Sequence, residues 1–163
     1  MYHTIVAPLD GSKRAERILP HLEELAHHYN ARVIFLQVVE LHPIALESEG
    51  NYMERCQEEL ERQTKQIETY LAGLEGEFRE KGIKARTRVV QGPVVEAIIN
   101  TAESEGADLI AIASHGRSGL SRVFYGSVTA RRIASYRSTS PAHPIARPSM
   151  REIVHIKVPF SPV

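Results

Sequence analysis

Hydrophobic residues along this chain follow two spacings, one typical of buried strands and the other typical of amphipathic helices. Short runs that are apolar throughout or alternate in polarity predict strands at residues 4–9, 32–39, 84–90 and 107–113. The run at 84–90 alternates in polarity, which suits a strand at the edge of the sheet. Apolar residues at helical spacing predict helices at 12–29, 53–81 and 94–106, and a further helix that opens at Gly126. Strands that alternate with helices predict a doubly wound α/β fold built on a mostly parallel sheet.

Pro20 and the prolines of the C-terminal tail refine this pattern. Pro20 lies inside the first helical stretch, where we expect it to kink the helix or remove one hydrogen bond. Several prolines follow residue 137, and each removes a hydrogen-bond donor that a strand would need. The candidate for a final strand is therefore the apolar run at 153–158. We therefore expect a single domain over 1–163 with an atypical C-terminal tail at 138–163.

Composition narrows the classes of protein that the chain can belong to. The 163 residues fit one domain, and 20 basic residues balance 20 acidic ones, which gives no pull toward DNA, RNA or an anionic membrane. No apolar run approaches the roughly 20 residues of a membrane helix, and residues 1–6 look like a strand, not a signal segment. The single cysteine, Cys56, excludes an internal disulfide. These features predict a cytoplasmic protein.

The chemistry of the chain is concentrated after the strand predicted at 107–113. A glycine-rich loop follows at 113–119, and Gly126-Ser127 then opens a helix. Such a loop holds phosphate, because its backbone amides point at the anion and the helix N-terminus adds its dipole. In doubly wound sheets ligands bind beyond the carboxyl ends of the strands, where Asp10, Val38 and this loop all lie. The pattern predicts a nucleotide-binding module, with a plain strand-to-helix turn as the alternative.

Taken together and in order, these segments resemble the universal stress protein family over about residues 1–135. The segments that carry the resemblance are 5–12, 38–40, 92–93, 107–110, 114–122 and 126–128. The resemblance implies a five-stranded Rossmann-like fold of the adenine nucleotide alpha-hydrolase-like type. It also implies a homodimer and a cytoplasmic role in the stress response.

The ATP-binding branch of that family has a glycine, two residues, a second glycine, nine residues, and then Gly-Ser or Gly-Thr. Here Gly116 and Gly126-Ser127 match this spacing, while Ala113 stands in the place of the first glycine. The added methyl of an alanine narrows the approach of a ligand to the backbone. The resemblance implies ATP as the ligand, with Mg²⁺ or Mn²⁺ as its cation.

The resemblance also assigns roles to individual residues. Asp10 would contact the ribose-phosphate side of the nucleotide or a bound divalent cation, and the Val38 backbone would read the adenine edge. The candidate nucleotide contacts are Pro8, Asp10, Val38, Ala113, His115, Gly116, Arg117, Gly126, Ser127, Val128 and Thr129. Simpler interpretations stay open for three of them: Asp10 as a turn carboxylate, Pro8 as a stiff strand end, and His115 as a turn histidine.

Three functional hypotheses follow. The first is an ATP-binding regulatory or protective stress protein. The second is a nucleotide-free homodimeric scaffold of the same fold, which the departure at Ala113 and the unusual tail favour. The third is a hydrolase or nucleotidyl-transfer enzyme on the same scaffold, since a fold does not fix function. The sequence predicts no catalytic residue, because no glycine run ends in Gly-Lys-Ser or Gly-Lys-Thr and no nucleophile–base pair is evident. At most, slow ATP hydrolysis is compatible with this set of residues.

Overall fold

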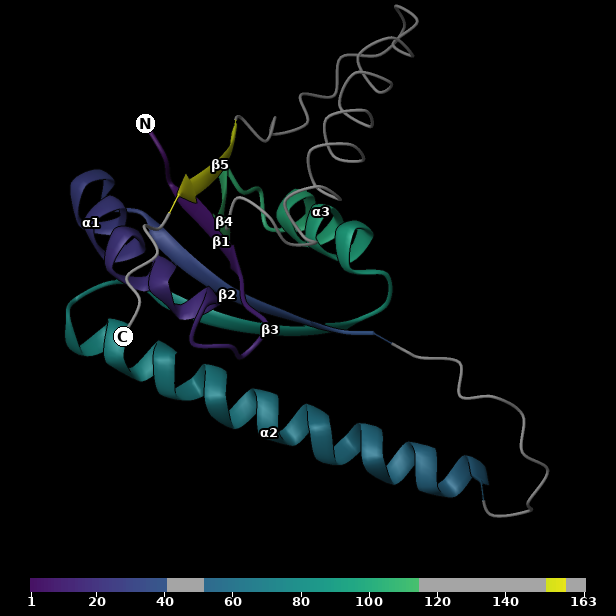
Figure 1. Cartoon of the computed structure of the whole chain (residues 1–163). Coiled ribbons are helices and arrows are strands. Elements are labelled where there is room, and N and C mark those ends of the chain that lie inside the picture. Colours follow the sequence, from purple (N-terminus) through teal and green to yellow (C-terminus); the bar gives the residue numbers. More distant parts are fainter. Residues whose placement is uncertain (41–51, 115–151, 158–163) are drawn as a thin grey trace, which may run out of the picture.

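A computed structural model shows a parallel sheet with helices on both faces (Figure 1). The structure describes residues 1–40, 52–114 and 152–157. The elements follow in this order: β1 (Thr4–Pro8), the 3₁₀ helix η1 (Ala15–Ile18), α1 (Leu19–Tyr29), β2 (Arg32–Val39), α2 (Tyr52–Glu80), β3 (Ala85–Gln91), α3 (Val94–Ser104), β4 (Leu109–Ser114) and β5 (Glu152–Lys157). The predicted α/β fold is confirmed.

The strands are arranged in the order β3-β2-β1-β4-β5, and every neighbouring pair is parallel. From β1 the chain builds outward through β2 to β3, and then continues on the other side of β1 with β4 and β5. The strand order therefore reverses between β1 and β4, which is the point where open α/β sheets bind ligands. The edge position expected for a strand of alternating polarity is confirmed, because β3 lies at one edge of the sheet.

Two hydrophobic clusters cover the two faces of the sheet. Helices α1 and α2 pack on one face, and α3 packs on the other (Figure 1). Because successive side chains of a strand point to opposite faces, Phe35 of β2 joins the α1/α2 cluster while Ile34 and Leu36 join the α3 cluster. This explains why β2 is apolar almost throughout, as expected for a strand that is covered on both sides.

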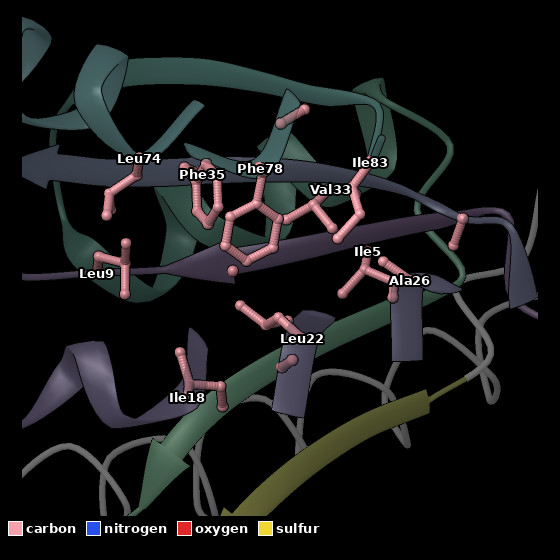
Figure 2. Close-up of a cluster of buried hydrophobic side chains, with 14 of the residues drawn as sticks. Ile5, Leu9, Ile18, Leu22, Ala26, Val33, Phe35, Leu74, Phe78 and Ile83 are labelled. Atoms are coloured by element: carbon pink, nitrogen blue, oxygen red, sulfur yellow. The ribbon is translucent and has the colours of Figure 1, made fainter. Parts of the chain in front are cut away.

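An aromatic pair lies at the centre of the α1/α2 cluster (Figure 2). The rings of Phe35 in β2 and Phe78 in α2 meet edge to face, with centroids 4.9 Å apart and an interplanar angle of 90°. Both side chains are buried, and Leu22 of α1 and Ile83, just before β3, belong to the same cluster. The pair fixes the last turns of α2 against the middle of the sheet.

The first helical stretch differs from the prediction of one continuous helix from residue 12. The Ser12 Oγ accepts a hydrogen bond from the backbone N–H of Ala15, the first residue of the helical stretch, at 3.1 Å. The stretch then divides into η1 and α1, and Pro20 falls in the first turn of α1. A proline there removes no helical hydrogen bond, because the N–H groups of a first turn have no partner within the helix. The division between the two helices takes the place of the expected kink.

The candidate final strand is confirmed, one residue earlier than predicted. β5 runs parallel to β4, with pairs from Leu109↔Glu152 to Ser114↔Lys157. It forms the edge of the sheet opposite β3. Within the described ranges, no helix has the combination of length and apolar character that a membrane span requires.

We expect Phe78→Ala to lower the free energy of unfolding by about 3–5 kcal/mol, because it removes a buried ring and leaves a cavity against Phe35. Urea unfolding followed by circular dichroism measures this loss. Gln66→Ala is the matched control, since Gln66 is exposed on the same helix and should change stability by less than about 0.5 kcal/mol. Equal effects of the two variants would contradict the packing of α2 on the sheet.

Candidate functional site

The candidate site lies at the carboxyl edge of the sheet, where β1 separates β2 from β4. Because these strands are parallel, Pro8 at the end of β1, Val38 near the end of β2 and Ala113 near the end of β4 all lie at this edge, with Asp10 just beyond β1. The structure thus brings together the four predicted site residues that it describes. The other predicted contacts lie outside the described residues: His115, Gly116, Arg117, Gly126, Ser127, Val128 and Thr129.

Pro8 has a role beyond that of a stiff strand end. The N–H of Asp108 donates to the carbonyl of Thr4, so the backbone polar groups of even-numbered β1 residues face β4. The backbone nitrogen of Pro8 therefore faces β4, and because a proline has no N–H, it cannot donate a hydrogen bond to that strand. In the described structure the β1–β4 pairs are Ile5↔Leu109 and Val6↔Ile110. The proline thus stops the hydrogen-bonded ladder between β1 and β4 before the carboxyl edge.

β2 continues beyond the end of β1, and this leaves part of its backbone facing the site. The last β1–β2 pair is Pro8↔Leu36, and the N–H of Leu9 donates to the Leu36 carbonyl at 2.8 Å. The Val39 carbonyl accepts from Gly92 on the opposite, β3 side of the strand. Since backbone groups alternate in direction along a strand, the N–H and C=O of Val38 face the β1 side, beyond the end of that strand.

The turn after β1 is organised by Asp10. Its Oδ1 accepts a hydrogen bond from the backbone N–H of Ser12 at 2.9 Å, which is an Asx turn. Gly11 adopts a φ of 75°, a left-handed conformation that favours glycine. Asp10 therefore acts as a turn carboxylate, as its simpler interpretation predicted. The residue is also exposed to solvent. Contact of Asp10 with a nucleotide or a cation stays a prediction.

A glutamine that the sequence-based prediction did not select lies beneath this turn. A Cβ built on Gly11 would be 3.8 Å from Nε2 and 4.0 Å from Oε1 of Gln37 in β2. Among the residues that the structure describes, Gln37 Oε1 is the buried side-chain polar atom that lacks a hydrogen-bond partner. The signal available in the sequence was one amide inside a strand that is otherwise apolar from Val33 to Val39.

Ala113 contributes to the core as well as to the edge. Its side chain packs against the α1/α2 cluster, and the residue pairs with Ile156 of β5. The methyl group that distinguishes it from the glycine of the ATP-binding motif is therefore a packing contact.

Acidic side chains gather beside the turn, on the α1/α2 side. The phenol of Tyr70 in α2 donates to Glu16 Oε1 at 3.2 Å, and Lys13 Nζ lies 2.7 Å from Glu16 Oε2. Burial and the nearby charges of Glu16, Asp10 and Glu77 raise the pKa of Tyr70, so the phenol is a neutral donor at physiological pH. Across the described ranges, no three His, Cys, Asp or Glu side chains are placed to hold a metal ion.

Comparison with known proteins identifies the family. The universal stress protein family matches residues 1–136. Universal stress protein MJ0531 of Methanocaldococcus jannaschii is 31% identical over 139 residues, which cover 80% of this chain and 75% of that relative. The solved structure of MJ0577 from the same organism aligns with a TM-score of 0.68 at 27% identity, covering 99% of both chains. The structure of UspA from Lactobacillus plantarum shares the fold, with a TM-score of 0.61, 19% identity and coverage of 82% of this chain and 91% of that one. The chain therefore belongs to the universal stress protein family.

Proposed function

We propose that this protein binds ATP together with Mg²⁺ or Mn²⁺ at the carboxyl edge of β1, β2 and β4, and acts as a regulatory or protective stress protein. The observation that carries the proposal is the Val38 backbone, whose N–H and C=O face the space beyond the end of β1. A donor and an acceptor on one residue complement the edge of adenine, where N1 accepts and the exocyclic amine donates. Membership of the family agrees with this ligand class.

The other described residues support the same placement. Pro8 ends the β1–β4 ladder at the point where the strand order reverses. Asp10 presents an exposed carboxylate next to that point. Phosphate binding is assigned from the sequence alone, to Gly116, Gly126 and Ser127. A structural neighbour of 20% identity and TM-score 0.55 is a universal stress protein in complex with cAMP, which has the same adenine and ribose groups as ATP.

We propose that the bound nucleotide acts by changing conformation or the choice of partner, including the partner copy in a homodimer. The described residues at the edge offer backbone groups, one carboxylate and one amide, which suit binding and not fast chemistry. A nucleotide-free homodimeric scaffold is the competing function. It would show neither binding of ATP nor a shift of the melting temperature on addition of ATP and Mg²⁺.

The first test replaces Gly126, the third glycine position of the motif, which opens the predicted helix. We expect Gly126→Val to abolish ATP binding with the fold retained, because a branched side chain would fill the position of the phosphate. Isothermal titration calorimetry with ATP and Mg²⁺ measures the affinity, and circular dichroism checks the fold. Gly76→Val is the matched control, since an added Cβ there meets nothing within 4 Å. Unchanged affinity in Gly126→Val would show that the phosphate site is misplaced.

A second test separates the two roles of Asp10. Asp10→Asn keeps a side-chain oxygen for the N–H of Ser12 but removes the negative charge. We expect it to retain the melting temperature of the wild type and to bind ATP in the presence of Mg²⁺ about tenfold more weakly, the scale of one hydrogen bond to a charged group. Affinity equal to that of the wild type would restrict Asp10 to its role in the turn.

A further inference from the structure

A purely structural role does not explain the side-chain amide of Gln37. Its Oε1 is buried and, within the described part of the chain, has no hydrogen-bond partner. A buried acceptor without a partner costs about 1–3 kcal/mol. An apolar residue would avoid this cost, since the neighbouring β2 positions Phe35 and Leu36 are buried and apolar. Costs of this kind are typical of functional sites.

The position of Gln37 indicates what such a function would be. Its side chain lies on the α1/α2 face, because it alternates with that of Val38, which packs on the α3 cluster. The turn at Gly11 lies directly over the amide, with 3.8 Å between Nε2 and a Cβ built on the glycine. Asp10 and Gly11 are exposed, and Gln37 as a whole is only partly buried. The amide therefore lies next to an exposed turn that borders the candidate site.

We infer that Gln37 is a specificity-determining residue of the nucleotide site, and that its Oε1 accepts a hydrogen bond from a hydroxyl of the ribose. This inference rests on the proposed function. Gln37 precedes Val38, to which the base is assigned, and its amide lies next to Gly11 in the turn at Asp10, to which the ribose-phosphate side is assigned. The terminal torsion of a glutamine has a broad energy profile, so the amide can turn toward the partly exposed side of its site. A ligand hydroxyl then supplies the donor that the protein does not.

The experiment compares ATP, 2′-deoxy-ATP and 3′-deoxy-ATP by isothermal titration calorimetry, each with Mg²⁺. We expect the wild type to bind ATP about tenfold more tightly than at least one deoxy analogue, the effect of one lost hydrogen bond. In Gln37→Leu the affinities should agree within about twofold. Gln91→Leu is the matched control, because Gln91 is exposed at the end of β3, and it should keep the preference of the wild type.

A second readout does not need any ligand. Gln37→Leu removes the unpartnered acceptor, so we expect the melting temperature of the nucleotide-free protein to rise. A glutamine with a structural role would give the opposite sign. Gln37→Met has a similar unbranched shape and replaces the leucine variant if that variant does not fold.

The outcomes distinguish this inference from the proposed function. If the wild type does not bind ATP, the proposed function fails, and the inference fails with it. If the wild type binds ATP but Gln37→Leu and Gln37→Met keep its preference for the ribose, the inference alone is overturned. A lower melting temperature in both variants would also overturn it, since the amide would then be a stabilising group.

Discussion

The parallel pairing of β1 with two neighbours is the constraint on which the rest of the structure depends. β1 pairs with β2 as far as Pro8, but its ladder with β4 comprises Ile5 and Val6. The cause is local, because Pro8 faces β4 and has no N–H to donate. β2 meanwhile continues to Val39. Because β2 extends further than β1, backbone polar groups on the β1 side of β2 are left without a partner strand at the carboxyl edge of the described structure.

The core and the edge follow different physical rules. In the core, strands that are covered on both faces bury apolar side chains, and the Phe35–Phe78 contact fixes the long helix α2 on the sheet. At the edge the polar groups are not all satisfied by the protein itself, as Gln37 shows. Buried polar groups in native proteins are almost always hydrogen-bonded. The exception at Gln37 is therefore informative, and it lies beside the turn that the nucleotide is proposed to contact.

The strands and helices could be predicted from the sequence because their apolar residues recur at regular spacing. β2 was predicted with its observed bounds, and the edge position of β3 followed from its alternating polarity. Periodicity cannot show the consequence of Pro8, which depends on the neighbour that the proline faces. It also cannot show that the amide of Gln37 lacks a partner, because that depends on the turn at Gly11 in another element. The phosphate-binding part of the prediction, around Gly116 and Gly126, lies outside the described residues.

The most direct measurement follows the amide of Val38 by nuclear magnetic resonance while ATP and Mg²⁺ are added. Binding at the carboxyl edge predicts a saturable change in the Val38 signal, together with slower hydrogen exchange of that amide. Val33, at the opposite end of the same strand, should be unaffected. Saturation of the protein by ATP with no change at Val38, or no binding of ATP at all, would contradict an adenine site at this edge.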